Sequence, residues 1–155
     1  MQQLPRILLA EDSVDDKDLA LAALAESNLA NEVVWLEDGQ MVLDYLFYEG
    51  AYVDRPRGLP AVLLLDLKMP RVDGLEVLER IKTHPELKVL PVVMLTSSRE
   101  ERDVVKSYGL GVNAYVVKPV EFSAFVSALK ELGVFWAVLN HPPPSAGSGT
   151  PKSIR

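Results

Sequence analysis

A chain of 155 residues with 48% hydrophobic and 25% charged residues has the size and composition of one globular domain. Its formal net charge of -6 disfavours nonspecific binding to nucleic acid or to an anionic membrane, because both require a basic surface. Cysteine is absent, and the sequence shows neither a signal peptide nor an apolar run near the ~20 residues that span a bilayer, so we expect a cytoplasmic protein.

Short apolar runs alternate with amphipathic stretches along the chain. The apolar runs predict five strands, at residues 6–10, 32–36, 61–66, 91–96 and 114–118. The amphipathic stretches predict five helices, at residues 14–27, 41–48, 74–83, 99–108 and from about 120 onward. Ser13 is the expected N-cap of the first helix. Apolar strands without polar alternation, each followed by a helix, indicate an α/β fold: a doubly wound parallel sheet with helices on both faces.

Two stretches stand outside this alternation. Residues 49–60 form a long connection rich in glycine, proline and charge, and residues 141–155 have the composition of a flexible tail. We therefore expect one folded domain over residues 1–140, followed by the tail. Nothing after the last predicted helix is long enough for a second, nucleic-acid-binding domain.

Polar side chains follow four of the predicted strands at the points where the strands end. They are Glu11 and Asp12, then Asp66, Thr96 and Lys118. The carboxyl ends of parallel strands meet at one edge of a sheet, so these groups should converge. Crowded carboxylates repel one another, which raises the pKa of at least one of them and favours a divalent cation such as Mg²⁺ or Mn²⁺. Beside such an ion, Asp66 suits nucleophilic attack on a phosphoryl group, with Thr96 and Lys118 contacting its oxygens.

Each residue also has a simpler explanation. An aspartate after an apolar strand is commonly a turn or N-cap residue, and acids favour the start of a helix. Their joint placement at four strand ends makes coincidence improbable. For Tyr115, within the last strand, and for Trp136, plain packing remains an open alternative.

The segments that carry these residues resemble the receiver domain of bacterial two-component response regulators over about residues 6–132. They are "ED" at 11–12, "LLLDLKMPRVDG" at 63–74, "VVMLTSS" at 92–98 and "AYVVKP" at 114–119. The resemblance implies a flavodoxin-like sheet with strand order 2-1-3-4-5. It also implies a cis bond before Pro119 and phosphorylation of Asp66 by a histidine kinase.

The resemblance further assigns roles to individual residues. Asp12, Asp66 and the backbone carbonyl of Lys68 would hold Mg²⁺ or Mn²⁺ directly, and Glu11 would hold it through water. Thr96 and Tyr115 would form a switch pair, and Lys118 would bind the phosphoryl group. Phosphorylation would then change the surface made by the fourth helix, fifth strand and fifth helix.

A narrower resemblance, to regulators that partner bacterial phytochromes, rests on two segments. They are "YEGAYVDRPRGLP" at 48–60 and "ELGVFWAVLNHPPP" at 131–144. It implies a bacteriophytochrome as the kinase. The uncharged stretch 134–140 also needs a partner for Phe135, Trp136 and Leu139, because the sheet offers no further surface there. The resemblance implies a two-fold homodimer through the face of the fourth helix, fifth strand and fifth helix, in which each copy's extension reaches over the other.

Competing functions fit the sequence less well. An aspartate-nucleophile phosphatase usually carries a second acid two residues after the nucleophile as general acid-base, and Lys68 occupies that position. No "GxxxxGK[ST]" motif for nucleotide binding occurs. A receiver that serves only as a binding module would not require Asp66, Thr96 and Lys118 together. We therefore expect a signalling protein rather than an enzyme.

Overall fold

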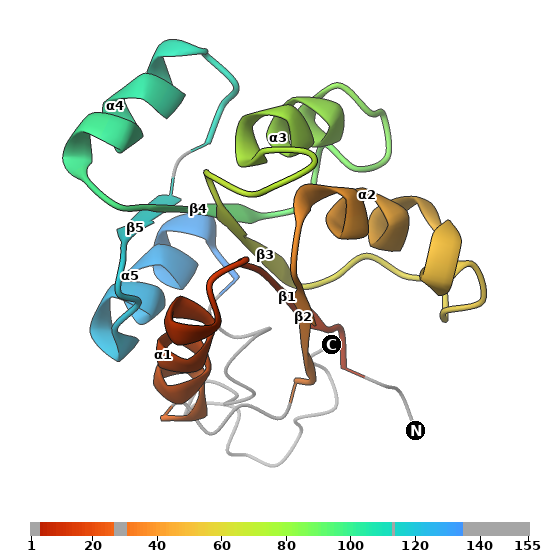
Figure 1. The fold of residues 1–155 in the computed structure, drawn as a ribbon, viewed down its shortest axis with the longest axis horizontal. Helices are drawn as coiled ribbons and strands as arrows, with labels where there is room; N and C mark the ends of the chain where they lie inside the picture. Colours follow the sequence, from red (N-terminus) through yellow and green to blue (C-terminus); the bar gives the residue numbers. More distant parts are fainter. Residues whose placement is uncertain (1–3, 27–30, 113, 135–155) are drawn as a thin grey trace, which may run out of the picture.

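Five parallel strands form one sheet in the computed structural model, which describes residues 4–26, 31–112 and 114–134 (Figure 1). The strands are β1 (Ile7–Ala10), β2 (Val33–Leu36), β3 (Val62–Asp66), β4 (Val92–Thr96) and β5 (Ala114–Val117). Their order across the sheet is β2-β1-β3-β4-β5, with every neighbouring pair parallel. The predicted α/β fold and strand order are confirmed.

Five α-helices cover both faces of this sheet. They are α1 (Val14–Ala25), α2 (Gly39–Phe47), α3 (Gly74–Lys82), α4 (Arg99–Ser107) and α5 (Phe122–Leu132). In Figure 1, α1 and α5 lie on one face, whereas α2, α3 and α4 lie on the other. None of the helices in the described ranges is long and apolar enough to cross a membrane.

Several helix ends differ from the prediction by one or two residues. Helix α2 begins two residues earlier than expected, because the Asp38 side chain accepts a hydrogen bond from the Met41 N–H at 2.8 Å and caps it. The connection at 49–60 contains a short 3₁₀ helix, η1 (Gly50–Tyr52), which was not predicted.

The core lies in two layers, one on each side of the sheet. Leu8, Leu63 and Met94 point toward the layer under α2, α3 and α4, and Leu9 and Leu64 point toward the layer under α1 and α5. Every residue of β1, β3 and β4 is buried, which explains why these strands lack polar alternation. The three central strands are thus fixed on both faces, and their carboxyl ends form a rigid edge.

A close backbone approach shapes that edge beside Asp66. A Cβ atom on Gly74, at the start of α3, would lie 2.2 Å from the carbonyl oxygen of Asp66. Only glycine therefore lets α3 begin so near the end of β3.

Candidate functional site

Strand register brings the predicted site residues together at the carboxyl edge of the sheet. Ala10 pairs with Leu65, so the residues that follow β1 lie beside Asp66 at the end of β3. The carboxylates of Glu11, Asp12 and Asp66 lie close enough for one oxygen from each to be within 4.8 Å of the others. Glu11 and Asp66 are buried, with 1% and 4% of their surfaces exposed, whereas Asp12 is exposed. The cluster is therefore open to solvent on the Asp12 side.

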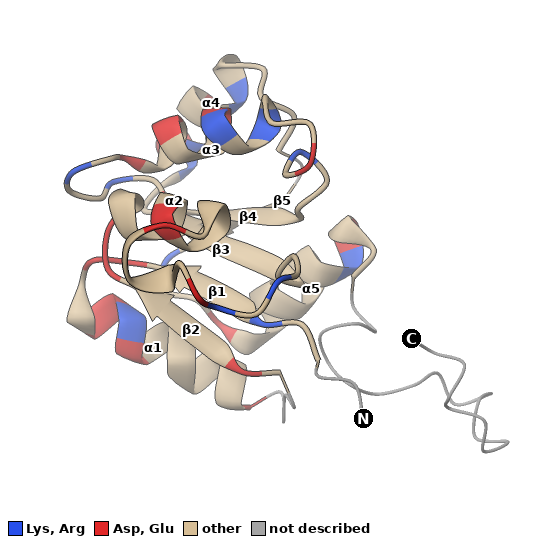
Figure 2. Cartoon of the chain, turned by 90° about the vertical axis from the view of Figure 1, so that its right-hand side faces the viewer, with Lys and Arg blue, Asp and Glu red and all other residues tan. Residues whose placement is uncertain are grey.

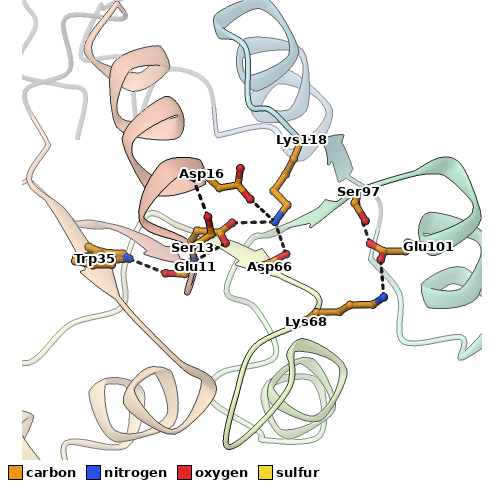
Figure 3. A network of polar contacts seen from close by, with 9 residues as sticks. All are labelled: Glu11, Ser13, Asp16, Trp35, Asp66, Lys68, Ser97, Glu101 and Lys118. Atoms are coloured by element: carbon orange, nitrogen blue, oxygen red, sulfur yellow. Dashed lines mark hydrogen bonds and ion pairs between the residues drawn. The ribbon is translucent and has the colours of Figure 1, made fainter.

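Lys118 is the cation at the centre of this cluster (Figure 3). Its Nζ lies 3.2 Å from Glu11 Oε1, 3.2 Å from Asp66 Oδ1 and 3.1 Å from Asp16 Oδ2. The Lys118 N–H donates to the Thr96 carbonyl at 2.7 Å, and the bond from Lys118 to Pro119 is cis, as expected.

The charges around Asp66 change its protonation. Burial raises the pKa of the Asp66 carboxyl most, and the neighbouring Glu11 carboxylate adds to the effect, while Lys118 opposes it; the resulting pKa is about 7. Burial by itself lowers the pKa of Lys118, but Asp66, Asp16 and Glu11 outweigh it and raise that pKa above its usual value. The prediction that one crowded carboxyl has a raised pKa is confirmed. One ammonium does not balance the carboxylates that surround it.

The donor set fits a hard divalent cation. Three carboxylates offer only oxygen ligands, which Mg²⁺ and Mn²⁺ prefer, and their excess negative charge favours a divalent ion. The exposed Asp12 side leaves a route of entry. The loop after β3 begins at Leu67 and carries the backbone carbonyl of Lys68, the further ligand that the family resemblance implies.

Thr96 has a buried hydroxyl that no described group satisfies. The residue is 0% exposed, and its Oγ1 has no hydrogen-bond partner in the described ranges. A buried hydroxyl without a partner is costly, so such groups commonly face a ligand site. Thr96 ends β4, next to Asp66 at the end of β3. Its hydroxyl is therefore a candidate donor to an oxygen atom bound at Asp66.

Tyr115 and the Lys68 side chain point elsewhere. The Tyr115 hydroxyl donates to the Val112 carbonyl at 3.2 Å, and its ring packs against the core beneath α4. The Lys68 side chain is 80% exposed and pairs with Glu101 Oε2 at 3.3 Å, away from Asp66 in Figure 3. Phe135, Trp136 and Leu139, the predicted dimer contacts, lie outside the described residues.

Sequence reasoning missed several neighbours of the site. Asp16, in the first turn of α1, pairs with Lys118 but reads in the sequence as an ordinary helix-start acid. The indole N–H of Trp35 donates to the Glu11 carbonyl at 2.7 Å and anchors its backbone. Glu101 accepts from the Ser97 N–H at 2.8 Å, which lowers its pKa. The local sequence does not predict the contacts of Asp16 and Trp35, because their partners are distant in the sequence.

The chain is similar to a family model and to several known proteins. Residues 7–130 match the family model described as response regulator receiver domain. Response regulator Rcp1 of Synechocystis is 41% identical over 130 residues, which cover 84% of this chain and 87% of Rcp1. The structure of its Mn²⁺-bound form has a TM-score of 0.68 at 40% identity and matches 86% of this chain and 94% of that one.

Two further solved structures are similar. The bacteriophytochrome response regulator AtBRR has a TM-score of 0.86 at 59% identity, covering 90% of this chain and 100% of that chain. The phosphorylated cyanobacterial phytochrome response regulator RcpA has a TM-score of 0.69 at 41% identity, and the match covers 86% of this chain and 94% of that chain.

Proposed function

The chain belongs to the response regulator receiver domain family, and from this membership we propose that it is a phosphorylation switch whose acceptor is Asp66. One observation carries the proposal. Asp66 Oδ1 lies 3.2 Å from the Lys118 ammonium at a sheet edge that also holds the unsatisfied, fully buried Thr96 hydroxyl. A carboxylate nucleophile, a hydroxyl donor and an ammonium are the groups that acceptance of a phosphoryl group requires.

The proposed transfer joins a carboxylate oxygen of Asp66 to phosphorus and breaks the bond from phosphorus to the histidine of a kinase. Asp66 must be ionised to attack, although its pKa of about 7 in the metal-free site leaves it partly protonated near neutral pH. A bound Mg²⁺ or Mn²⁺ supplies the positive charge that favours the ionised carboxylate. Asp12, Asp66 and the Lys68 carbonyl would hold the ion directly, and Glu11 through water.

Phosphorylation replaces the single negative charge of the Asp66 carboxylate with almost two on the phosphoryl group, and the resulting switch is the second part of the proposal. Thr96 would turn its hydroxyl to a phosphoryl oxygen, and Tyr115 would leave Val112 to fill the vacated space. The α4-β5-α5 surface that would change already exposes large apolar side chains. They are Val104, Tyr108, Val117 and Phe122.

A histidine kinase of the bacteriophytochrome type is the proposed partner, in the cytoplasm and without nucleic acid. AtBRR, which this chain resembles, is a bacteriophytochrome response regulator, and RcpA is a cyanobacterial phytochrome response regulator. Lys68, two residues after Asp66, is paired with Glu101 and supplies no general acid, which supports a switch rather than a phosphatase.

Phosphotransfer tests this function. An autophosphorylated bacteriophytochrome kinase should transfer its phosphoryl group to the wild type within minutes and should transfer none to Asp66→Asn. Radiolabel on the separated proteins measures the transfer. A regulator that accepts phosphate from acetyl phosphate but never from such a kinase would end the photoreceptor partnership and leave Asp66 as the acceptor.

The segment 134–140 supports a homodimer in which the extension of one 1–140 domain packs on its partner, with residues 141–155 as a tail. Phe135, Trp136 and Leu139 supply the apolar contacts in this proposal. Light scattering at tens of micromolar should give a dimer for the wild type and a monomer for Phe135→Ala/Trp136→Ala. Val89→Ala, which removes an exposed apolar side chain from the connection before β4, is the control for apolar loss outside the α4-β5-α5 surface. A monomeric wild type would contradict the dimer.

A further inference from the structure

A cavity lies at the opposite edge of the sheet from the carboxylate cluster. Its volume is about 220 Å³, and it is formed between the segment that leads into β1 and the connection that leads into β3. Arg6 directly precedes β1 and Pro60 lies just before β3, whereas the carboxylates follow the far ends of these strands. The cavity is therefore separate from the proposed phosphorylation site.

Among the residues described, three arginines line the cavity and no acidic residue does. Arg55 is the most constrained of them. Its guanidinium carbon lies 4.0 Å from the ring centroids of both Tyr45 and Tyr48, and its Nε donates to the Tyr45 carbonyl at 2.7 Å. Stacking between two rings and a backbone hydrogen bond hold this cation in place. In Figure 2 the connection before β3 passes in front of β1, and blue segments mark its basic residues.

Arg57 supplies a cation that the protein does not neutralise. Its guanidinium carbon also lies 4.0 Å from the Tyr48 centroid, so the guanidiniums of Arg55 and Arg57 both contact this ring. The neighbouring Gly58 N–H donates to the Tyr48 hydroxyl at 2.9 Å and fixes the loop against that ring. Within the described ranges, Arg57 has no ion pair or hydrogen bond to another residue. The N–H donors of Arg57 are thus held by stacking on Tyr48, and within the described ranges they have no acceptor.

The rest of the lining limits the kind of ligand. Arg6 is partly neutralised by Glu32, whose Oε1 accepts from the Arg6 Nε at 2.9 Å. Excess positive charge therefore remains at Arg55 and Arg57, in a chain whose net charge is -6. The other walls are mostly leucine and proline side chains. A cavity of about 220 Å³ is smaller than the roughly 300–1,000 Å³ of sites for drug-sized ligands.

We propose that this cavity binds a small organic oxyanion, a carboxylate or phosphate ester whose apolar part is no larger than one ring. The guanidinium of Arg57 pairs with the oxyanion, because its planar fork matches carboxylate and phosphate oxygens. The leucine and proline walls contact the apolar part. A neutral analogue of the same shape keeps the apolar contacts and loses the charge pairing.

Amide chemical shifts test the proposal with two probes, benzoate and phenyl phosphate. The titration uses ¹⁵N-labelled Asp66→Asn without divalent cations, so that the acidic site does not accept the probe. At least one probe should give saturable shifts at the amides of Arg55, Arg57 and Gly58, and the tighter one identifies the oxyanion. Benzamide, the neutral analogue of benzoate, should bind more weakly. Absence of saturation up to tens of millimolar, or equal binding of benzamide, would overturn the proposal.

A substitution then tests whether Arg57 supplies the positive charge that binds the oxyanion. Arg57→Gln should weaken binding of the preferred probe roughly fivefold, the scale of one partly exposed charge pair. Arg80→Gln is the matched control, because the Arg80 guanidinium, on α3, lies 5.2 Å from the centroid of the Phe47 ring on α2 and Arg80 does not line the cavity. Urea melts check that both variants fold. In the Asp66→Asn parent protein, which keeps both arginines, added salt should weaken binding of the probe. Unchanged affinity in folded Arg57→Gln would reject the role of Arg57.

Discussion

Removal of divalent cations is expected to slow phosphorylation of the regulator by small phosphodonors at least about 100-fold. In the metal-free site Asp66 is 4% exposed, its pKa is about 7, and the Glu11 carboxylate lies beside it. Without a cation, an incoming phosphoryl group therefore meets a partly protonated nucleophile in an excess of negative charge. Phosphate-affinity electrophoresis of timed reactions with acetyl phosphate, with Mg²⁺ or with EDTA, measures the rates.

At limiting Mg²⁺, Asp12→Asn should lose most of the phosphorylation rate that removal of the cation costs the wild type. Its rate should recover partly as the Mg²⁺ concentration is raised. The matched control is Asp18→Asn, which removes an exposed acid of α1 that pairs with Lys17 and does not belong to the cluster. Phosphorylation at the full rate in EDTA would show that the acidic cluster is not a cation site.

Asp66→Asn is expected to stabilise the metal-free protein by on the order of 1–2 kcal/mol above pH 7. An aspartate in the unfolded chain titrates near about 3.9, whereas the folded-state pKa of Asp66 is about 7. Between these values the folded protein keeps a proton that the unfolded chain has lost. The free energy of unfolding should therefore fall as pH rises from about 4 to about 7, and remain lowered above that range.

The size of this gain follows from two opposing effects. Linkage over that pH interval allows up to about 4 kcal/mol, and loss of the charged partner of Lys118 offsets part of it. Asp12→Asn should gain less, because Asp12 is exposed and its charge is solvated.

Urea melts of both variants and the wild type at pH 5 and pH 8, in EDTA and in Mg²⁺, measure these differences. Mg²⁺ should stabilise the wild type more than either variant. A metal-free Asp66→Asn that is less stable than the wild type at pH 8 would contradict the strain assigned to the site.

The fold could be predicted from the sequence because its central strands are buried on both faces. The unbroken apolar run that ends at Asp66 has no other common explanation, and the helices between such runs fix a parallel sheet. The start of α2 was harder to predict, since the helix opens on Gly39, a weak helix former, and depends on the Asp38 cap. The 3₁₀ turn η1 lies in a stretch whose composition indicates only a loop.

The centre of the site was likewise accessible from the sequence, whereas its supporting contacts were not. Strand ends identify Asp66, Thr96 and Lys118, because parallel topology alone brings them together. Asp16 contacts Lys118 across 102 positions in sequence, and this contact depends on the packing of α1 beside α5 on one face of the sheet. The stacking of two arginines on Tyr48 depends in the same way on how one loop folds back.

Mass spectrometry of peptides from the phosphorylated protein tests the central claim most directly. After reaction with acetyl phosphate and Mg²⁺, the wild type should carry one phosphoryl group, on the peptide that contains Asp66. Reduction with borohydride should mark that residue as the acyl phosphate, and Asp66→Asn should carry none. A phosphoryl group on another residue of the wild type, or equal incorporation by Asp66→Asn, would contradict the account.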